Sequence, residues 1–201
     1  MKNTTISLDL AKNVIQACVI TKHGEVSLNK PMSPSNVERL LRQSESCVVA
    51  MEGCGSFHHW GRLAQQYGHT VKGMSPKNVK PFISKQKTDA NDAIGIAIAS
   101  SQPNMPLCQV KTLEQQALQS LQVSRKWLDK TLTSLGNHIR AQCYEYGVAI
   151  AKGKASIRNK IVALLDDNST SLPQTIKQIL LVLWQQYGVL EQQKKALTKQ
   201  I

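Results

Sequence analysis

A short apolar segment with a single acid at its end constrains the fold most strongly. Residues 47–52 read CVVAME, which is the length of a β-strand and contains no charged residue before Glu52. A strand that is apolar at consecutive positions is buried on both faces, so helices must cover both sides of its sheet. The sequence therefore predicts a sheet with helical layers rather than a bundle of helices alone.

The surrounding segments alternate between strand and helix patterns. Strands are predicted at 4–10, 14–21, 26–30, 47–52 and 69–74. Ser33 is expected to be the N-cap of an intervening helix, with Pro34 at its first position. Gly68 is expected to follow the end of the next helix as its C′ residue. The fold class predicted by this order is α/β, with a mixed sheet covered by helices.

The pattern changes after residues 103–106, PNMP, and becomes almost wholly helical. An apolar seam runs through Leu121, Leu128, Leu132, Leu135 and Ile139. Its spacing is typical of a coiled coil or a helical hairpin. A further helix is predicted from about Pro173. We expect two domains: residues 1–110, which carry the sheet, and residues 111–201, which are helical, dimerise and contact nucleic acid.

The charge balance favours a polyanionic partner. The 201-residue chain carries 25 lysines and arginines against 13 acids, a formal net charge of +12. Such an excess attracts nucleic acid, and DNA or RNA is therefore the expected partner. A membrane surface is disfavoured because the basic residues are not concentrated on one amphipathic helix beside an aromatic face.

Two further compositional features narrow the protein class. The longest apolar candidate, residues 176–184, is well short of the roughly 18–20 residues that cross a bilayer, and the N-terminus lacks the apolar core of a signal peptide. Five cysteines are scattered without a CxxC pair, which argues against a disulfide framework or a zinc ribbon. A cytoplasmic protein with reduced thiols is expected.

Four of the few acids lie where a binding site would form. Asp9 and Glu52 end two predicted strands, and ligand sites in open α/β sheets collect at the carboxyl ends of strands. Asp89 and Asp92 are three positions apart and project from one helix face. These carboxylates would suit two divalent cations about 3.5–4 Å apart. An all-oxygen ligand set favours Mg²⁺ or Mn²⁺ over zinc.

Simpler interpretations exist for most of these acids. Asp89 and Asp92 would also fit a capping arrangement, with Asp89 as N-cap and Asp92 at N3. Asp9 precedes a turn, and aspartate is a common turn former. Glu52 closes an apolar strand and has no comparable structural role. Capping and metal binding therefore both remain open for the helical pair.

Basic residues precede and follow the aspartate pair in the chain. The segment before it carries Lys72, Lys77, Lys80, Lys85 and Lys87 and no acid. Because prolines interrupt this run just before the aspartate pair, we favour a loop that grips phosphates over a merely solvated surface. The predicted helices add Arg125, Lys126, Lys130 and Arg140, which either extend that grip or form an ordinary exposed helix face.

His58 and His59 follow Cys54 but have no second cysteine pair or suitable third ligand nearby in the sequence. Zinc binding is therefore disfavoured. One of the two histidines is expected to pack near the carboxylates, and the other to face solvent.

Four segments in order carry a family resemblance. They read SLDLAKN (7–13), MEGCGSFHHWGRLAQQYGH (51–69), SPKNVKPFISKQKTDANDA (75–93) and VKTLEQQALQSL (110–121). Together they closely resemble the DEDD transposases of bacterial insertion sequences, which are related to the Piv DNA invertases. Gly53 departs from the common pattern, since many relatives have alanine there.

The resemblance implies a RuvC-like, RNase H-type domain whose tetrad Asp9, Glu52, Asp89 and Asp92 is catalytic and binds Mg²⁺ or Mn²⁺. Members are site-specific recombinases that cleave and transfer DNA strands during transposition, and some are directed by a structured guide RNA. They also carry a serine nucleophile on a later domain, which this sequence is not expected to include. A homo-oligomer, a dimer or tetramer, is expected. The alternative is a non-catalytic nucleic-acid-binding module.

Overall fold

The computed structural model describes residues 3–84, 86, 88–166 and 172–200. The chain divides into two compact units, residues 1–116 and 117–201. The first unit contains a six-stranded sheet in the order β3-β2-β1-β4-β5-β6. Its strands are β1 (Thr5–Asp9), β2 (Ile15–Ile20), β3 (Val26–Met32), β4 (Val48–Glu52), β5 (Thr70–Met74) and β6 (Leu107–Cys108). The predicted α/β fold with a mixed sheet is confirmed.

The sheet combines parallel and antiparallel pairs. β1 pairs in parallel with β4, and β4 in parallel with β5, so their carboxyl ends lie at the same edge. β2 and β3 continue from β1 as an antiparallel meander, as predicted. β6, which is antiparallel to β5, was not predicted. It has only two residues, both exposed, and so leaves no apolar pattern in the sequence.

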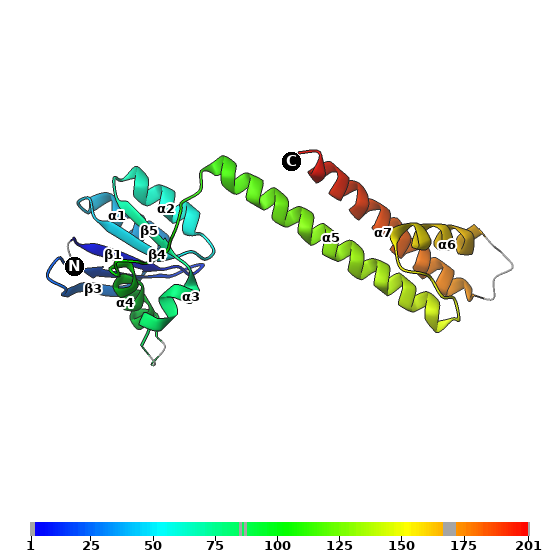
Figure 1. Ribbon diagram of the computed structural model, residues 1–201, viewed down its shortest axis with the longest axis horizontal. Coiled ribbons are helices and arrows are strands. Elements are labelled where there is room, and N and C mark those ends of the chain that lie inside the picture. Colours follow the sequence, from blue (N-terminus) through cyan, green and yellow to red (C-terminus); the bar gives the residue numbers. More distant parts are fainter. Residues whose placement is uncertain (1–2, 85, 87, 167–171, 201) are drawn as a thin grey trace. The chain divides into compact units, whose positions relative to one another are not determined.

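Helices cover both faces of this sheet (Figure 1). One face carries α1 (Pro34–Gln43) and α2 (Phe57–Gln66). The other carries α3 (Pro76–Val79), the 3-10 helix η1 (Lys80–Phe82) and α4 (Asp89–Ser100). The predicted helix ends are confirmed: the Ser33 hydroxyl accepts a hydrogen bond from the Asn36 N–H at 3.3 Å, and Gly68 after α2 has a φ of 82°.

The two faces of the sheet differ in chemistry. Because side chains alternate along a strand, odd and even positions belong to opposite layers. The layer under α1 and α2 is apolar and includes Ile6, Leu8, Val49 and Met51, all at most 1% exposed. The layer under α4 includes Ala50, together with the polar Ser7 of the same row across the sheet. By the same alternation, Asp9 and Glu52 belong to this second layer.

The second unit contains α6 (Lys154–Asp166), α7 (Gln174–Thr198) and most of α5 (Leu113–Glu145). Leu128, Leu132 and Ile139 of the predicted seam are buried in a cluster with side chains of α6 and α7, and Leu135 packs against it. In this part of α5 the seam therefore packs within one chain, as in a helical hairpin, whereas dimerisation stays a prediction. Among the described helices, none has the length and apolar composition needed to span a bilayer.

Candidate active site

Asp9 and Glu52 lie side by side at the carboxyl edge of the sheet. β1 and β4 pair in parallel with Leu8 opposite Met51, so the next residue of each strand, Asp9 and Glu52, comes alongside the other. Both side chains are half-buried and belong to the layer that faces α4. The structure thus places these two carboxylates as their strand-end positions predicted.

Asp92 is brought to the same region by α4, which packs across β1, β2 and β4. The N-cap of α4 is Thr88, whose hydroxyl accepts a hydrogen bond from the Asn91 N–H at 3.2 Å. Asp89 is therefore the first helical residue and Asp92 the fourth, so the interpretation of Asp89 as N-cap with Asp92 at N3 is wrong. Both acids still lie near the positive end of the helix dipole.

The electrostatics indicate that three carboxylates lie close together. Burial raises the pKa of Glu52, and the negative charges of Asp9 and Asp92 raise this pKa further. Asp92 Oδ1 is buried and has no hydrogen-bond partner among the described residues. A buried acceptor without a partner costs roughly 1–3 kcal/mol. A cation bound between these carboxylates would relieve both the mutual repulsion and the unsatisfied oxygen.

These carboxylates are near one another but are not closed around an ion. Within the described residues, no three acidic, histidine or cysteine side chains form a ready-made metal site. The oxygen donors Asp9, Glu52 and Asp92 nevertheless fit Mg²⁺ or Mn²⁺ by their chemistry. Asp89 is exposed at the start of α4, one helical turn from Asp92, and does not contribute to the pKa shift of Glu52.

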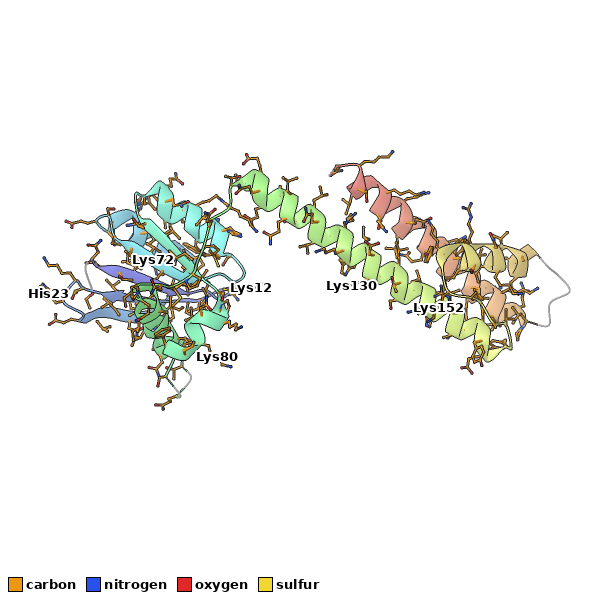
Figure 2. The ribbon with its side chains drawn as sticks, viewed as in Figure 1. Lys12, His23, Lys72, Lys80, Lys130 and Lys152 are labelled. Atoms are coloured by element: carbon orange, nitrogen blue, oxygen red, sulfur yellow. The ribbon has the colours of Figure 1, made fainter. Side chains whose placement is uncertain are left out.

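The predicted lysines of the first unit fall into separate groups. Lys77 on α3 is exposed in the segment before α4. Lys80 on η1 is exposed in the same segment (Figure 2). Lys72 is half-buried on β5, and its Nζ donates a hydrogen bond to the Ser100 carbonyl at 2.8 Å. Its side chain lines a pocket with the first residues of β1 and β4, away from the carboxylates that end these strands. Lys85 and Lys87 lie outside the described residues.

The basic residues of the second unit also differ in environment. Lys126 is exposed on α5. Lys130 is exposed on the same helix (Figure 2). The Arg140 guanidinium donates to the carbonyls of Ala151 and Gly153 at 3.3 and 3.2 Å and so holds the connection between α5 and α6. Arg125 is half-buried, and its Nε has no hydrogen-bond partner in the described part of the chain.

His58 contacts the segment that leads into α5. Its Nδ1 accepts a hydrogen bond from the Lys111 N–H at 3.2 Å, while Arg62 donates to the Lys111 carbonyl at 2.8 Å. Burial lowers the pKa of His58, and the charges of Lys111 and Arg62 lower this pKa further. The neutral imidazole thus serves as an acceptor that fastens residue 111 to α2, while His59 is exposed.

Three polar side chains beneath α4 were not predicted from the sequence. Ser7, Gln16 and Asn29 belong to strands of the meander and form hydrogen bonds that reach α4 or one another. Ser7 is fully buried, and Gln16 is 7% exposed. Their sequence signal is the alternation of polar and apolar residues in TISLD and IQACVI, which marks one face of each strand as different.

The arrangement of the sheet and its acids indicates a class of fold. A mixed sheet with acids at the carboxyl ends of adjacent strands and a further acid on a helix across them is compatible with an RNase H-like fold. A family model of IS110-type DEDD transposases, described as "Transposase", matches residues 6–147. The chain belongs to this family, and the matched region contains all four acids of the expected tetrad.

Curated relatives agree with this assignment. The chain is 35% identical to a "Probable family 20 transposase" of Pseudomonas aeruginosa, over all of this chain and 60% of the relative. It is 32% identical to the transposase for insertion sequence element IS1111A of Coxiella burnetii, over 96% of this chain and 55% of the relative. It is also 32% identical to the transposase for element IS1328 of Yersinia enterocolitica, over 98% and 58%. The chain thus spans little more than half the length of these relatives.

Proposed function

We propose that this chain is the N-terminal region of a site-specific recombinase that cleaves and transfers DNA strands during transposition with Mg²⁺ or Mn²⁺. One observation carries the proposal. Asp9, Glu52 and Asp92 come from three different elements, yet they approach closely enough to shift the pKa of Glu52, and one oxygen of Asp92 is buried without a partner among the described residues. A buried acceptor without a protein partner calls for an explanation, and a bound cation beside three carboxylates would supply one.

In this proposal the four acids are the metal ligands, with Asp89 contributing from the exposed first turn of α4. When bound, divalent cations supply an activated water and neutralise the charge that develops on a phosphodiester. The protein contributes carboxylates fixed at a sheet edge and on a helix. The exposed Lys77 and Lys80 lie in the segment immediately before α4 and hold the nucleic-acid backbone by charge. Lys85 and Lys87 are included on sequence grounds alone.

Calorimetric titration with Mn²⁺ and Mg²⁺ tests the site directly. We expect Asp9→Ala and Asp92→Ala each to weaken Mn²⁺ affinity at least about tenfold, as ligand-shell changes commonly do. Glu45→Ala, which removes an exposed acid before the amino end of β4, at the opposite end of this strand from Glu52, is the matched control and should bind as the wild type does. Equal affinity in all four proteins contradicts the proposal.

A second function is favoured by the net charge of +12 together with the partial coverage of the relatives. In it, this chain is a nucleic-acid-binding module that does not cut DNA. A cleavage assay on a labelled duplex with Mn²⁺, run beside a binding assay, separates the two. Binding with no cleavage at any metal concentration supports the module.

We also propose a structured RNA and a second copy of the chain as partners. Lys126 and Lys130 give α5 an exposed basic surface that suits either nucleic acid. The first half of α5 exposes Leu118 and Trp127, at 53% and 60%, which favours self-association. Competition between RNA and DNA for the chain tests the first partner. Sedimentation at high protein concentration tests the second, and a monomer there would refute it.

A further inference from the structure

One row of side chains crosses the sheet directly beneath α4. Strand pairing aligns Asn29 of β3 with Cys18 of β2, Cys18 with Ser7 of β1, Ser7 with Ala50 of β4, and Ala50 with Lys72 of β5. Side chains aligned across neighbouring strands project from the same face. The next row towards the carboxyl edge contains Asp9 and Glu52. The row that contains Ser7 therefore lies one step behind the candidate metal ligands.

Three members of this row donate hydrogen bonds to backbone carbonyls of α4. Asn29 Nδ2 donates to the Ala90 carbonyl at 3.1 Å, and Ser7 Oγ donates to the Ala93 carbonyl at 2.6 Å. Lys72 Nζ donates to the Ser100 carbonyl at 2.8 Å. These contacts follow the helix from its first turn to its last residue. These hydrogen bonds fix the position of α4 along its own axis. Apolar packing alone would fix this position only weakly.

The sequence of α4 permits this close approach. Ala93 and Ala97 are fully buried against Cys18 and Ile20 of β2, and the small alanine side chains let helix carbonyls come within reach of short strand side chains. A carbonyl oxygen has two lone pairs, so it accepts a side-chain donor in addition to its helical hydrogen bond. Gln16 Nε2 donates to Asn29 Oδ1 at 2.7 Å and thereby orients the Asn29 amide towards Ala90.

Asp92 lies between the two bonded carbonyls at Ala90 and Ala93. We propose that Asn29, Ser7 and Lys72 are positioning residues, which hold α4 so that Asp92 stays beside Asp9 and Glu52. The three carboxylates repel one another before a cation binds, and the helix that bears one of them has to be held in place. This inference rests on the proposed metal site, and it assigns Lys72 to the helix rather than to nucleic acid.

Metal affinity and local backbone opening, measured on the same 201-residue chain, test the proposal. We expect Asn29→Ala and Ser7→Ala to weaken Mn²⁺ affinity about tenfold, the lower end of the range for residues that orient metal ligands. Lys72→Met should cause a smaller loss, because its contact lies at the far end of α4. Amide hydrogen exchange in the first turns of metal-free α4 should also quicken, whereas α1 and α2 keep their protection.

Ser27→Ala is the matched control, since Ser27 is on β3 like Asn29 but donates to the Val19 carbonyl within the sheet at 3.2 Å. It should leave both readouts unchanged. Ser7→Thr keeps the hydroxyl and should restore the affinity that Ser7→Ala loses. If Asp92→Ala abolishes Mn²⁺ binding while folded Asn29→Ala and Ser7→Ala bind as the wild type does, the positioning role is overturned and the metal site stands. If the wild type binds no metal, both are overturned.

Discussion

The two faces of the sheet differ in chemistry, although adjacent residues of the same strands form them. Under α1 and α2, Leu8 and Met51 are fully buried among apolar side chains. On the other face, their chain neighbours Asp9 and Glu52 are half-buried acids. The buried Ser7 hydroxyl on this face donates a hydrogen bond to a carbonyl of α4. Stability is thus concentrated on one face and positioned polar chemistry on the other, so substitutions on the two faces should have separable effects.

Truncating the apolar face should give the largest effect. Leu8 is 0% exposed and belongs to the apolar cluster under α1 and α2, so Leu8→Ala should lower the free energy of unfolding by about 2–5 kcal/mol. Urea denaturation measures this loss. The protein that remains folded should bind Mn²⁺ with wild-type affinity. Val14→Ala, at a position 51% exposed, is the control and should stay within about 0.5 kcal/mol. A comparable loss of stability in Leu8→Ala and Val14→Ala would contradict the assignment of stability to the apolar face.

Neutralising an acid on the polar face should raise the stability of the metal-free protein. The folded state raises the pKa of Glu52 above its unfolded value through burial and through Asp9 and Asp92. The ionised group therefore opposes folding at neutral pH, and stability associated with its protonated form is lost as pH rises through the folded pKa. Glu52→Gln should therefore stabilise the metal-free protein at pH 7 and raise its Tm.

This gain should shrink as the pH is lowered towards the ordinary glutamate range, because the wild-type group then becomes neutral too. Mn²⁺ should raise the Tm of the wild type and leave that of Glu52→Gln almost unchanged. Thermal melts with and without EDTA, at several pH values, measure both trends. A Glu52→Gln protein that is less stable than the wild type at pH 7 would show that the carboxylates are not in conflict.

Much of this contrast was readable in the sequence. Residues 47–52 predicted a strand buried on both faces, and Asp9 and Glu52 ended strands that prove to be neighbours in the sheet. Local capping signals also worked, as at Ser33 and Gly68. These features depend on contacts close in the chain or on the general rule that parallel strands end at one edge.

Features that depend on long-range register could not be predicted. Ser7 is 86 positions from its acceptor Ala93, and Asn29 is 61 positions from Ala90, so no local pattern links them. In the sequence, Lys72 is not distinguished from the other basic residues. Only the structure shows that it forms a hydrogen bond with the last residue of α4. The capping interpretation placed the N-cap of α4 one residue too late for a different reason: Thr88 and Asp89 are both good caps, and backbone geometry decides between them.

Two lysines on the α4 side of the sheet are expected to have different roles. Lys80 is exposed before α4, whereas Lys72 is hydrogen-bonded to the helix. Lys80→Ala should therefore reduce the slope of log affinity for duplex DNA against log salt by about 0.9, the value for one lost phosphate contact. Lys72→Met should leave that slope unchanged. Fluorescence anisotropy at several salt concentrations measures both, and equal slopes for the two variants would contradict the assignment.

The smallest effect is expected at Gly53, directly after Glu52. A Cβ at this position would lie 3.4 Å from both Cys108 Sγ and the Met74 carbonyl, which is ordinary contact. Gly53→Ala should therefore be neutral or stabilise the protein by up to about 1 kcal/mol, because alanine reduces the conformational entropy of the unfolded chain. Thermal unfolding measures this change, and Mn²⁺ affinity should stay constant.

Gly95→Ala on α4 is the informative contrast to Gly53→Ala. Alanine is the better helix former, yet a Cβ at Gly95 would lie 3.0 Å from the Phe82 carbonyl and 3.1 Å from Ile83 Cα, backbone atoms that cannot rotate away. Relief requires α4 to shift from η1, and the shift would carry Asp92 with it. We expect Gly95→Ala to lower both stability and Mn²⁺ affinity while Gly53→Ala lowers neither. If Gly95→Ala lowered stability alone, the placement of Asp92 would not depend on how tightly α4 is seated.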